Sequence, residues 1–372
     1  MALDGQYELV CGAFSSDAAR SQSFGQMLHL HPERCYANYA ELLKTEALLP
    51  AAERIDAVVI VTPNHLHYPI AKAAMESGFH VICDKPATMT LAQALTLKSI
   101  IDQTKRCYCL THTYTGYPMI KQARHLIASG DIGEVVKVVA EYSQGWLASQ
   151  DDERSKQASW RLDPKQSGIS SCMADIGVHA AQLAMYVTGL SISHICADLN
   201  TVVSGRQLDD DGTVLLKFDT GAKGVLLASQ IAIGDENNLK LRIYGSKKSL
   251  EWSQLDPNSL VVKSNTTTTE TYRTGAQNIC DAAKLATRTP AGHPEGYIEA
   301  FANLYMNFAK QILAHNTPQF QCNEAFDVPG ITDAINGMAF IENVVAASQS
   351  NTKWQPFNLT GQTVEGEHHD AI

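Results

Sequence analysis

The chain carries a lysine and an acid–histidine pair whose types and spacing could move a proton. Lys85 lies two residues after the mostly apolar run 79–83, and Asp175 precedes His179 by four residues. If Asp175 opens a helix, its side chain and that of His179 lie on one face and can interact. A histidine titrates near neutral pH and is therefore suited to general acid–base chemistry. Taken alone, the same pair also fits a helix cap with an incidental surface histidine.

Lys85 is predicted to stand where a parallel sheet ends. Residues 57–61 are mostly β-branched and predict a strand that is buried on both faces. Pro63 ends this strand, a helix follows, and residues 79–83 predict a second buried strand. Ligands of open α/β sheets bind beyond the carboxyl ends of the strands. The order strand, helix, strand therefore predicts a ligand site around residues 84–86.

These residues resemble a known family. Thr62-Pro63-Asn64-x-x-His67, followed one helix later by Asp84-Lys85-Pro86, is similar to the motifs of the glucose-fructose oxidoreductase/inositol dehydrogenase/rhizopine catabolism (Gfo/Idh/MocA) family. That family usually has Glu-Lys-Pro, so Asp84 is a shorter residue of like charge. Further signals keep the family's order: Gly130-Asp-Ile-Gly133, Trp160-Arg161-x-Asp163-Pro164, Asp175-Ile-Gly-Val-His179 and His293-Pro-Glu-Gly-Tyr297.

The resemblance implies an enzyme that transfers hydride between NAD or NADP and a sugar, cyclitol or related polyol. His179 would then be the general acid/base, Asp175 would orient a substrate hydroxyl or the imidazole, and Lys85 would bind and polarise the reacting oxygen. The other implied substrate contacts are Trp160, Arg161 and His293. The residues implied to bind cofactor are Thr62, Pro63, Asn64, His67, Asp84, Lys85 and Pro86.

The beginning of the chain departs from the family pattern. Members open with a strand, a Gly-x-Gly-x-x-Gly turn and a helix whose amino end faces the cofactor diphosphate. Here residues 7–13 already predict the second strand and residues 21–28 the helix after it, and the chain has no such glycine fingerprint. We therefore expect the first strand and its turn to be missing, through a late start of the chain or, as the less favoured explanation, in a degraded paralogue.

The residues that would meet the adenosine end of the cofactor follow the predicted strand 7–13. The family often has an aspartate there for the ribose, whereas this chain has Phe14-Ser15-Ser16-Asp17. Ser15 or Ser16 could hydrogen-bond the ribose hydroxyls, and Asp17 is expected to cap the next helix. No arginine precedes Arg20 to meet a 2′-phosphate. NAD is therefore preferred over NADP.

The rest of the chain predicts a second α/β domain. Residues 119–129 have helical spacing, and further helices are predicted at 175–187 and 295–314. From Val135 onward the alternation and the turns are typical of a large, mostly antiparallel sheet, whose open face we expect to form a homodimer or homotetramer. The strands are predicted at 135–142, 192–201, 213–218, 224–231, 239–244, 248–252 and 260–263. The predicted division is a truncated Rossmann-like domain at 1–113, a substrate and oligomerisation domain at 114–358 and a flexible tail at 359–372.

Composition limits the partners and the compartment. A net charge of -10 and a pI of 5.7 argue against nucleic acid or an anionic membrane as partner. No apolar stretch reaches the roughly 18 residues of a membrane span, and the first residues lack the order of a signal peptide. Nine cysteines at irregular spacing suit reduced thiols. We therefore expect a cytoplasmic protein.

Different functions stay open on these residues. The preferred one is an NAD(P)-dependent dehydrogenase or reductase that acts on CH–OH groups of a sugar or polyol. The alternative is a non-catalytic sugar-binding or assembly paralogue that has lost its cofactor, and cofactor titration separates the two. A metal-dependent isomerase would need a divalent ion at His65, His67 and His179; we expect no metal, with His65 facing solvent. The sequence does not name the sugar or the carbon.

Overall fold

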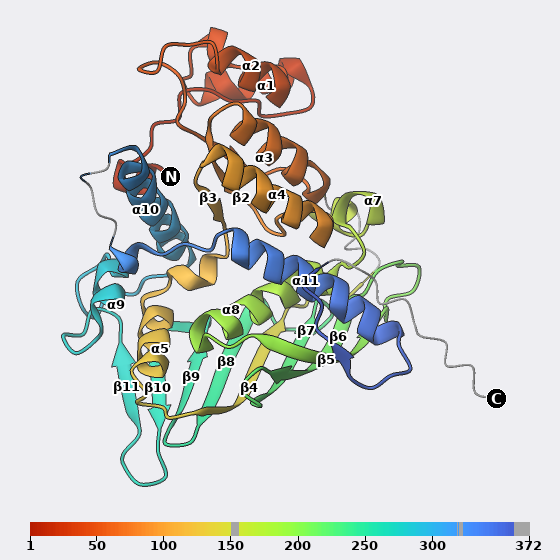
Figure 1. The fold of residues 1–372 in the computed structure, drawn as a ribbon, viewed down its shortest axis with the longest axis vertical. Helices are drawn as coiled ribbons and strands as arrows, with labels where there is room; N and C mark the ends of the chain where they lie inside the picture. Colours follow the sequence, from red (N-terminus) through yellow and green to blue (C-terminus); the bar gives the residue numbers. More distant parts are fainter. Residues whose placement is uncertain (150–155, 318, 320–322, 361–372) are drawn as a thin grey trace.

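Two β-sheets of unequal size organise the described part of the chain (Figure 1). The computed structural model describes residues 1–149, 156–317, 319 and 323–360. The small sheet lies in the upper half of Figure 1 and the large sheet in the lower half, with helices between them. From residue 361 on, the predicted tail at 359–372 lies outside the described residues.

The small sheet is parallel and has the predicted strand, helix, strand order. Its strands are β1 (Ala57–Ile60), β2 (His80–Cys83) and β3 (Tyr108–Leu110), in the spatial order β1-β2-β3. One face of β2 packs against α3 (His67–Glu76) and α4 (Leu91–Thr104), and the other against α10 (Tyr297–Asn316). Because both faces are covered, every residue of β2 is buried. The central strand thus has the predicted environment, and Lys85 follows its carboxyl end.

The beginning of the chain does not form the predicted strand at 7–13. In the described residues its one ladder contact is the parallel bridge between Gly12 and Cys35. β1 also differs from the prediction, because its first residues are only half-buried and Val61 is 71% exposed. The reason is the same in both places: β1 is an edge strand, and no described strand runs between it and residues 7–13. The next helices are α1 (Ala18–Met27), near the predicted 21–28, and α2 (Tyr39–Glu46).

The large sheet is mixed and has the order β11-β10-β9-β8-β4-β7-β6-β5-β12. Its neighbours are antiparallel except for the parallel pair β4–β7, so the prediction of a mostly antiparallel sheet is confirmed. The strands are β4 (Val135–Ser143), β5 (Ile192–Asn200), β6 (Asp211–Phe218), β7 (Lys223–Ser229), β8 (Asn238–Gly245), β9 (Ser249–Ser253), β10 (Asp256–Lys263), β11 (Glu270–Arg273) and β12 (Gln355–Pro356).

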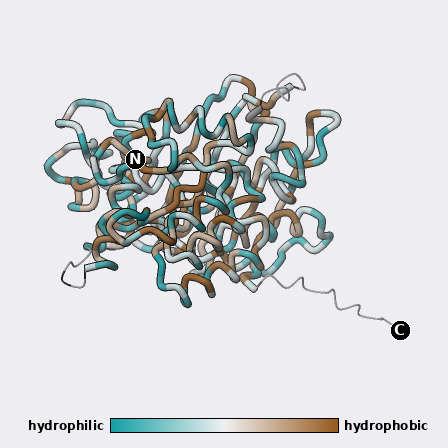
Figure 2. The backbone as a smooth tube through the Cα atoms, turned by 90° about the horizontal axis from the view of Figure 1, so that it is seen from above, coloured by the Kyte–Doolittle hydropathy of each residue, from teal (hydrophilic) through white to brown (hydrophobic). Residues whose placement is uncertain are grey.

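Helices cover one face of this sheet. α5 (Pro118–Ala128), α8 (Val178–Thr188) and α11 (Ile331–Gln349) lie over it, with α11 and α8 between the two sheets in Figure 1. Residues of β6 alternate as predicted, because Val214 and Leu216 face the helices whereas Thr213 and Leu215 face outward. Figure 2 shows the resulting core, with hydrophobic segments gathered in the middle of the molecule.

Shorter elements complete the fold, and one of them interrupts the helix predicted at 175–187. A π-helical turn, η6 (Met173–Gly177), precedes α8 and contains Asp175. In the described residues no helix is both long and apolar enough to cross a membrane. The remaining helices are α6 (Lys156–Arg161), α7 (Pro164–Ser167) and α9 (Asp281–Ala286), with short 3₁₀ turns at η1 (Ala2–Asp4), η2 (Pro32–Arg34), η3 (Asn64–Leu66), η4 (Thr113–Gly116) and η7 (Glu324–Phe326).

Candidate active site

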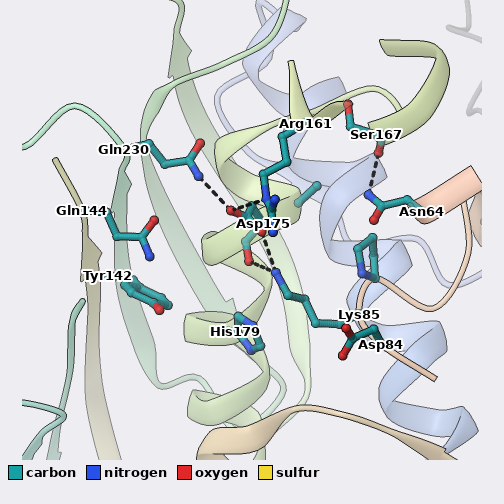
Figure 3. Close-up of polar contacts among 12 residues, drawn as sticks. Asn64, Asp84, Lys85, Tyr142, Gln144, Arg161, Ser167, Asp175, His179 and Gln230 are labelled. Carbon is teal, nitrogen blue, oxygen red and sulfur yellow. Dashed lines mark hydrogen bonds and ion pairs between the residues drawn. The ribbon is translucent and has the colours of Figure 1, made fainter. Parts of the chain in front are cut away.

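Lys85 reaches from the end of β2 to the helices of the large sheet. Its Nζ donates to Oδ1 of Asp175 at 2.8 Å and to the backbone carbonyl oxygen of Asp175 at 2.5 Å. The two side chains are 17% and 16% exposed, so water screens their attraction only weakly. Figure 3 shows them pointing toward each other from different parts of the fold. The structure therefore joins two of the three predicted catalytic residues in one ion pair.

Asp175 has partners on its second carboxylate oxygen as well. Oδ2 accepts a hydrogen bond from Nε2 of Gln230 at 2.9 Å and lies 3.3 Å from Nε of Arg161. Burial by itself would favour the neutral acid, but the charges of Lys85 and Arg161 outweigh it and lower the pKa of Asp175 to about 2. Asp175 is therefore an anion between two cations at neutral pH, and the cluster keeps an excess of positive charge.

The π-helical turn η6 sets the position of Asp175. A buried carboxylate, Asp209, accepts hydrogen bonds from the backbone N–H groups of Ser171 at 3.0 Å and Met173 at 2.9 Å. These bonds satisfy donors at the start of the turn that otherwise lack an intrahelical partner. α8 begins only at Val178, so Asp175 does not open a regular helix and its carboxylate turns to Lys85. In the described residues no bond joins it to the imidazole of His179, which differs from one of its expected roles.

His179 lies in the first turn of α8 and contacts another histidine. Its Nδ1 is 3.1 Å from Nδ1 of His112, and the two rings meet edge to face. Tyr114 makes a second edge-to-face contact with the ring. Burial, Lys85 and His112 together hold the pKa of His179 well below its usual range. The imidazole is therefore neutral at neutral pH, the state that a general base requires.

Sequence reasoning missed several polar residues around this cluster. His112 follows β3, Gln144 follows β4 and Gln230 follows β7, and Figure 3 shows Gln230 bonded to Asp175 and Gln144 beside Tyr142. Nε2 of Gln144 donates to Asn237, and the Tyr142 hydroxyl donates to the same oxygen. The signal was present, because β4 and β7 are parallel neighbours and the carboxyl ends of such strands meet at one edge. The rule that identified Lys85 also applies to His112 and Gln230.

The loop after β1 has polar atoms available to a cofactor. The Thr62 hydroxyl oxygen and Asn64 Oδ1 are buried and have no partner, although Asn64 Nδ2 donates to the Ser167 carbonyl at 3.1 Å. Buried polar atoms without a partner are rare and suit a ligand that supplies one. His67 differs from the expectation, because its ring nitrogens lie 2.6 Å from the Pro86 carbonyl oxygen and 2.8 Å from that of Thr62. His67 therefore ties the two loops together instead of facing a ligand.

The residues expected to meet the adenosine end of the cofactor are bonded within the protein or exposed. Ser15 Oγ accepts the backbone N–H of Asp17, and Ser16 is exposed. Asp17 caps α1 by accepting the N–H of Arg20 at 2.7 Å, which confirms its predicted role. The described residues thus fit the nicotinamide end of a dinucleotide through Thr62 and the neighbouring loop residues. They include no glycine-rich turn for its diphosphate.

The remaining cofactor-side residues support the lysine. Asp84 accepts a hydrogen bond from the Thr111 hydroxyl, which ties the end of β2 to the end of β3. Pro63 precedes η3, and Pro86 follows Lys85 through a cis peptide bond. The shorter Asp84, where the family usually has glutamate, is therefore engaged within the protein and holds the segment that carries Lys85.

Trp160 and Arg161 stand at the end of α6 above the ion pair. The Arg161 guanidinium lies 4.3 Å from the Trp160 ring centroid and 5.9 Å from that of Trp146, within the range of cation–π contacts. Figure 3 shows Arg161 approaching Asp175 from the side opposite His179. A narrow cleft beside the ion pair is lined by Asn64, Pro86, Trp160, Arg161, Ser167, Ser170, Ser171, Ala174 and Asp175.

Two predicted histidines lie apart from the cluster. His293 is exposed, precedes α10 instead of beginning it, and lies 3.2 Å from the Pro290 carbonyl through Nδ1. His65 is half-buried, and its Nδ1 has no partner among the described residues, so it faces solvent only in part. Within the described ranges no group of three or more histidine, cysteine or acidic side chains is arranged to hold a metal ion.

Comparisons with known proteins agree with this geometry. A model described as the GFO/IDH/MocA C-terminal domain matches residues 120–251, and one described as the oxidoreductase family, NAD-binding Rossmann fold, matches residues 2–112. The chain is 33% identical to an uncharacterised oxidoreductase, YfiI, of Bacillus subtilis over 94% of this chain and 90% of that protein.

Solved structures give the same result. The crystal structure of an inositol dehydrogenase homologue from Azotobacter vinelandii complexed with NAD+ superimposes with a TM-score of 0.91 at 32% identity, covering 94% of this chain and 90% of that chain. A structure of an inositol dehydrogenase homologue from the same organism with NADH and myo-inositol gives a TM-score of 0.88 at 31% identity, covering 94% of this chain and 90% of that chain. The chain therefore belongs to the Gfo/Idh/MocA family of NAD(P)-dependent oxidoreductases.

Proposed function

We propose that the protein transfers hydride between NAD(P) and a CH–OH group of a sugar, cyclitol or related polyol. The observation that carries the proposal is the cluster beyond β2, where the Lys85 ammonium is held by the Asp175 carboxylate on the turn that precedes His179. A fixed cation polarises an oxygen, and a neutral imidazole accepts a proton. Oxidation of an alcohol to a carbonyl needs both.

The proposed mechanism assigns one task to each of these residues. Thr62 and Asn64 would hold the nicotinamide end of the cofactor, which would supply the acceptor or donor of the hydride. During oxidation the hydroxyl proton passes to Nε2 of His179, and Lys85 stabilises the negative charge that develops on the oxygen. Asp175 holds the ammonium in place. In the reverse direction the His179 imidazolium returns the proton to the carbonyl oxygen.

The surroundings support a polyhydroxylated substrate. Gln144 and Gln230 lie at the carboxyl ends of β4 and β7 beside the ion pair, and Oε1 of Gln230 is buried without a partner. Amide groups donate and accept hydrogen bonds, as a ring of hydroxyl groups requires. The structural relative that contains myo-inositol supports the same substrate class. Trp160 and Arg161 would complete the pocket from α6.

A coupled assay tests the proposal. The protein is mixed with NAD+ or NADP+ and with each of a panel of polyols, and the reduced nicotinamide is followed by its absorbance. We expect reduction with at least one polyol, a preference for NAD+, and loss of the signal in Lys85→Ala. If neither cofactor binds in calorimetry, the non-catalytic alternative replaces the proposal; if a cofactor binds but no polyol is oxidised, the substrate class is wrong.

We also propose that the open face of the large sheet pairs with a second copy of the chain. Leu215, Leu227 and Tyr244 are exposed on strands of this sheet, each between 37% and 39%. Apolar side chains on one exposed sheet face are typical of an association surface. Analytical ultracentrifugation should find a dimer or tetramer that Leu227→Glu dissociates. A monomeric parent protein would contradict the proposal.

A further inference from the structure

His112 is a buried histidine at the end of the small sheet, and its ring contacts His179. It is 1% exposed and lies between β3 and η4. The Nδ1 atoms of the two rings are 3.1 Å apart, which is a hydrogen-bond distance. Nε2 of His112 is buried and has no partner in the described structure. This residue has no task in the mechanism above, although it is the one polar partner of His179 that the structure provides.

The contact between the rings restricts their protons. A neutral imidazole carries one proton, so a hydrogen bond between two Nδ1 atoms requires a proton on one of them and a lone pair on the other. If His112 donates, the proton of His179 sits on Nε2, and this atom then has no lone pair to accept a proton from the substrate. If His112 accepts, Nδ1 of His179 carries the proton and Nε2 has the lone pair.

Only the second arrangement suits proton abstraction. In the described residues no hydrogen bond is made to Nε2 of His179, so this atom is the one left to meet a substrate hydroxyl. After it accepts the proton, the imidazolium still donates through Nδ1 to His112, and the new charge keeps a partner. Resting on the proposed function, we infer that His112 is a positioning residue that accepts the Nδ1–H of His179 and thereby reserves Nε2 for the substrate proton.

The buried Nε2 of His112 makes this arrangement sensitive to substitution. When His112 accepts through Nδ1, its own proton lies on Nε2, and buried N–H groups without a partner are rare because they are costly. The competing arrangement avoids this cost but removes the base. An asparagine at this position offers an acceptor oxygen close to the place of Nδ1 without the buried Nε2–H. A phenylalanine keeps the ring and its edge-to-face contact but offers no acceptor.

The pair His112→Phe and His112→Asn therefore separates positioning from packing. We expect His112→Phe to lower kcat by roughly 10-fold or more at unchanged KM, because positioned acid–base catalysis contributes about 100-fold to 10,000-fold in total. His112→Asn should keep kcat within a few-fold of the parent. A purely structural role predicts the opposite order, because phenylalanine fills the space and asparagine leaves a void. That opposite order would overturn the inference.

The pH profile gives a second readout. The titratable groups that face His179 from the surrounding elements are Lys85, His112, Tyr114 and Tyr142. His112 stays neutral near physiological pH, because burial and Lys85 lower its pKa to about 3. A charged His112 would lower the pKa of His179, but the neutral His112 accepts its Nδ1–H and favours the imidazolium. Loss of this acceptor should therefore move the acid limb of kcat to lower pH in His112→Phe and leave it in place in His112→Asn. An unmoved limb in His112→Phe would contradict the inference.

A third readout does not depend on turnover. Selective ¹⁵N labelling of histidine reports which ring nitrogen of His179 carries the proton in the free protein. We expect the proton on Nδ1 in the parent and in His112→Asn. A proton on Nε2 in the parent would overturn the inference even if the protein oxidises polyols. A proton on Nδ1 in a protein that oxidises no polyol would instead leave the tautomer assignment standing and contradict the proposed function.

Discussion

Two carboxylates in this molecule, Glu46 and the largely buried Asp175, have very different surroundings. Glu46, in the region of α1 and α2, accepts hydrogen bonds from the guanidinium of Arg34, from the Tyr36 hydroxyl at 2.8 Å and from the Ile55 N–H at 3.2 Å. Its polar neighbours are satisfied. Asp175 is equally well bonded, but in the described part of the chain several buried atoms of the proposed site have no partner: Thr62 Oγ1, Asn64 Oδ1, His112 Nε2 and Gln230 Oε1.

The difference indicates that the Glu46 cluster stabilises the fold and that the Asp175 cluster is arranged to bind a ligand. A buried ion pair whose hydrogen bonds are all made inside the protein contributes to the folded structure and leaves nothing for a ligand. Unpaired buried atoms cost stability and are retained where a ligand pairs them. The Lys85–Asp175 pair also joins residues 90 positions apart, so it holds the small sheet against the large one at the place of the proposed reaction. Substitutions should therefore change chemistry at Asp175 and stability at Glu46.

The largest expected effect is that of His179→Ala. Because the substitution removes the proton acceptor, kcat should fall by about 100-fold to 10,000-fold. The loss should be partly relieved at high pH, where hydroxide replaces the missing base. Steady-state kinetics of polyol oxidation over a pH series measures both effects. His125→Ala, at an exposed histidine of α5, is the matched control, and activity that disappears in the control but persists in His179→Ala would refute the assignment of the acid/base.

Lys85→Ala should have the next largest effect. It removes a charge from the reacting oxygen in the transition state, so kcat and kcat/KM should both fall by roughly 100-fold or more. The control is Lys98→Ala, which removes a lysine paired with Asp102 on the exposed side of α4. Full activity in Lys85→Ala, measured in the same assay, would show that the cation near Asp175 is structural, like Arg34 beside Glu46.

Much of this arrangement could be predicted from the sequence. The mostly apolar run 79–83 identified β2, because a strand that is buried on both faces consists mainly of apolar residues. Lys85, just after it, identified the ligand site at the carboxyl end of this strand. The positions of β4 to β10 after Val135 could be predicted from alternation and turn residues, whereas the two edge strands β11 and β12 were not predicted. The helix α11 gave no clear signal, since it is apolar on more than one face where it lies between the sheets.

The rest depended on contacts that sequence spacing does not encode. The four-residue interval between Asp175 and His179 predicted neighbours on one helix face, but the π-helical turn held by Asp209 turns the carboxylate to Lys85 instead. His112 lies 67 residues from His179, so only the fold brings them together. The strand predicted at 7–13 did not form, since a pattern of apolar residues cannot show whether a partner strand is present.

The contribution of the Lys85–Asp175 ion pair to stability should be measurable as its loss in acid. The pKa of Asp175 in the folded protein is about 2, below the unfolded value of about 3.9, so its contribution to stability is complete above the unfolded value and is lost as pH falls through the folded one. The contribution is about 3 kcal/mol. Urea unfolding of the parent and of Asp175→Asn should therefore give a stability difference that shrinks from about pH 4 downward.

The exposed pair Lys98–Asp102 is the control for this titration. Its side chains are 50% and 60% exposed, so solvent screens the attraction and Asp102→Asn should change stability little at any pH. A difference between the parent and Asp175→Asn that stays constant down to the acid transition would mean that the Asp175 carboxylate is not held by Lys85 and Arg161 in solution.

The smallest expected effect tests the unpaired atoms directly. Thr62→Val replaces a buried hydroxyl that has no partner in the protein by a methyl group of the same shape. The free protein should be as stable as the parent or slightly more stable, because a desolvated polar group is removed. The dissociation constant for NADH, measured by calorimetry, should rise by roughly 2-fold to 10-fold, the equivalent of one lost hydrogen bond.

Thr274→Val provides the matched comparison for Thr62→Val. The Thr274 hydroxyl is also buried without a partner, but it lies beyond β11 at the far end of the large sheet. The same substitution there should leave NADH affinity unchanged, since no cofactor contact is expected at that place. Equal affinity in both variants would show that the unpaired hydroxyl of Thr62 is a packing imperfection like that of Thr274. A weaker affinity in Thr62→Val alone would identify the loop after β1 as the part of the protein that holds the nicotinamide end.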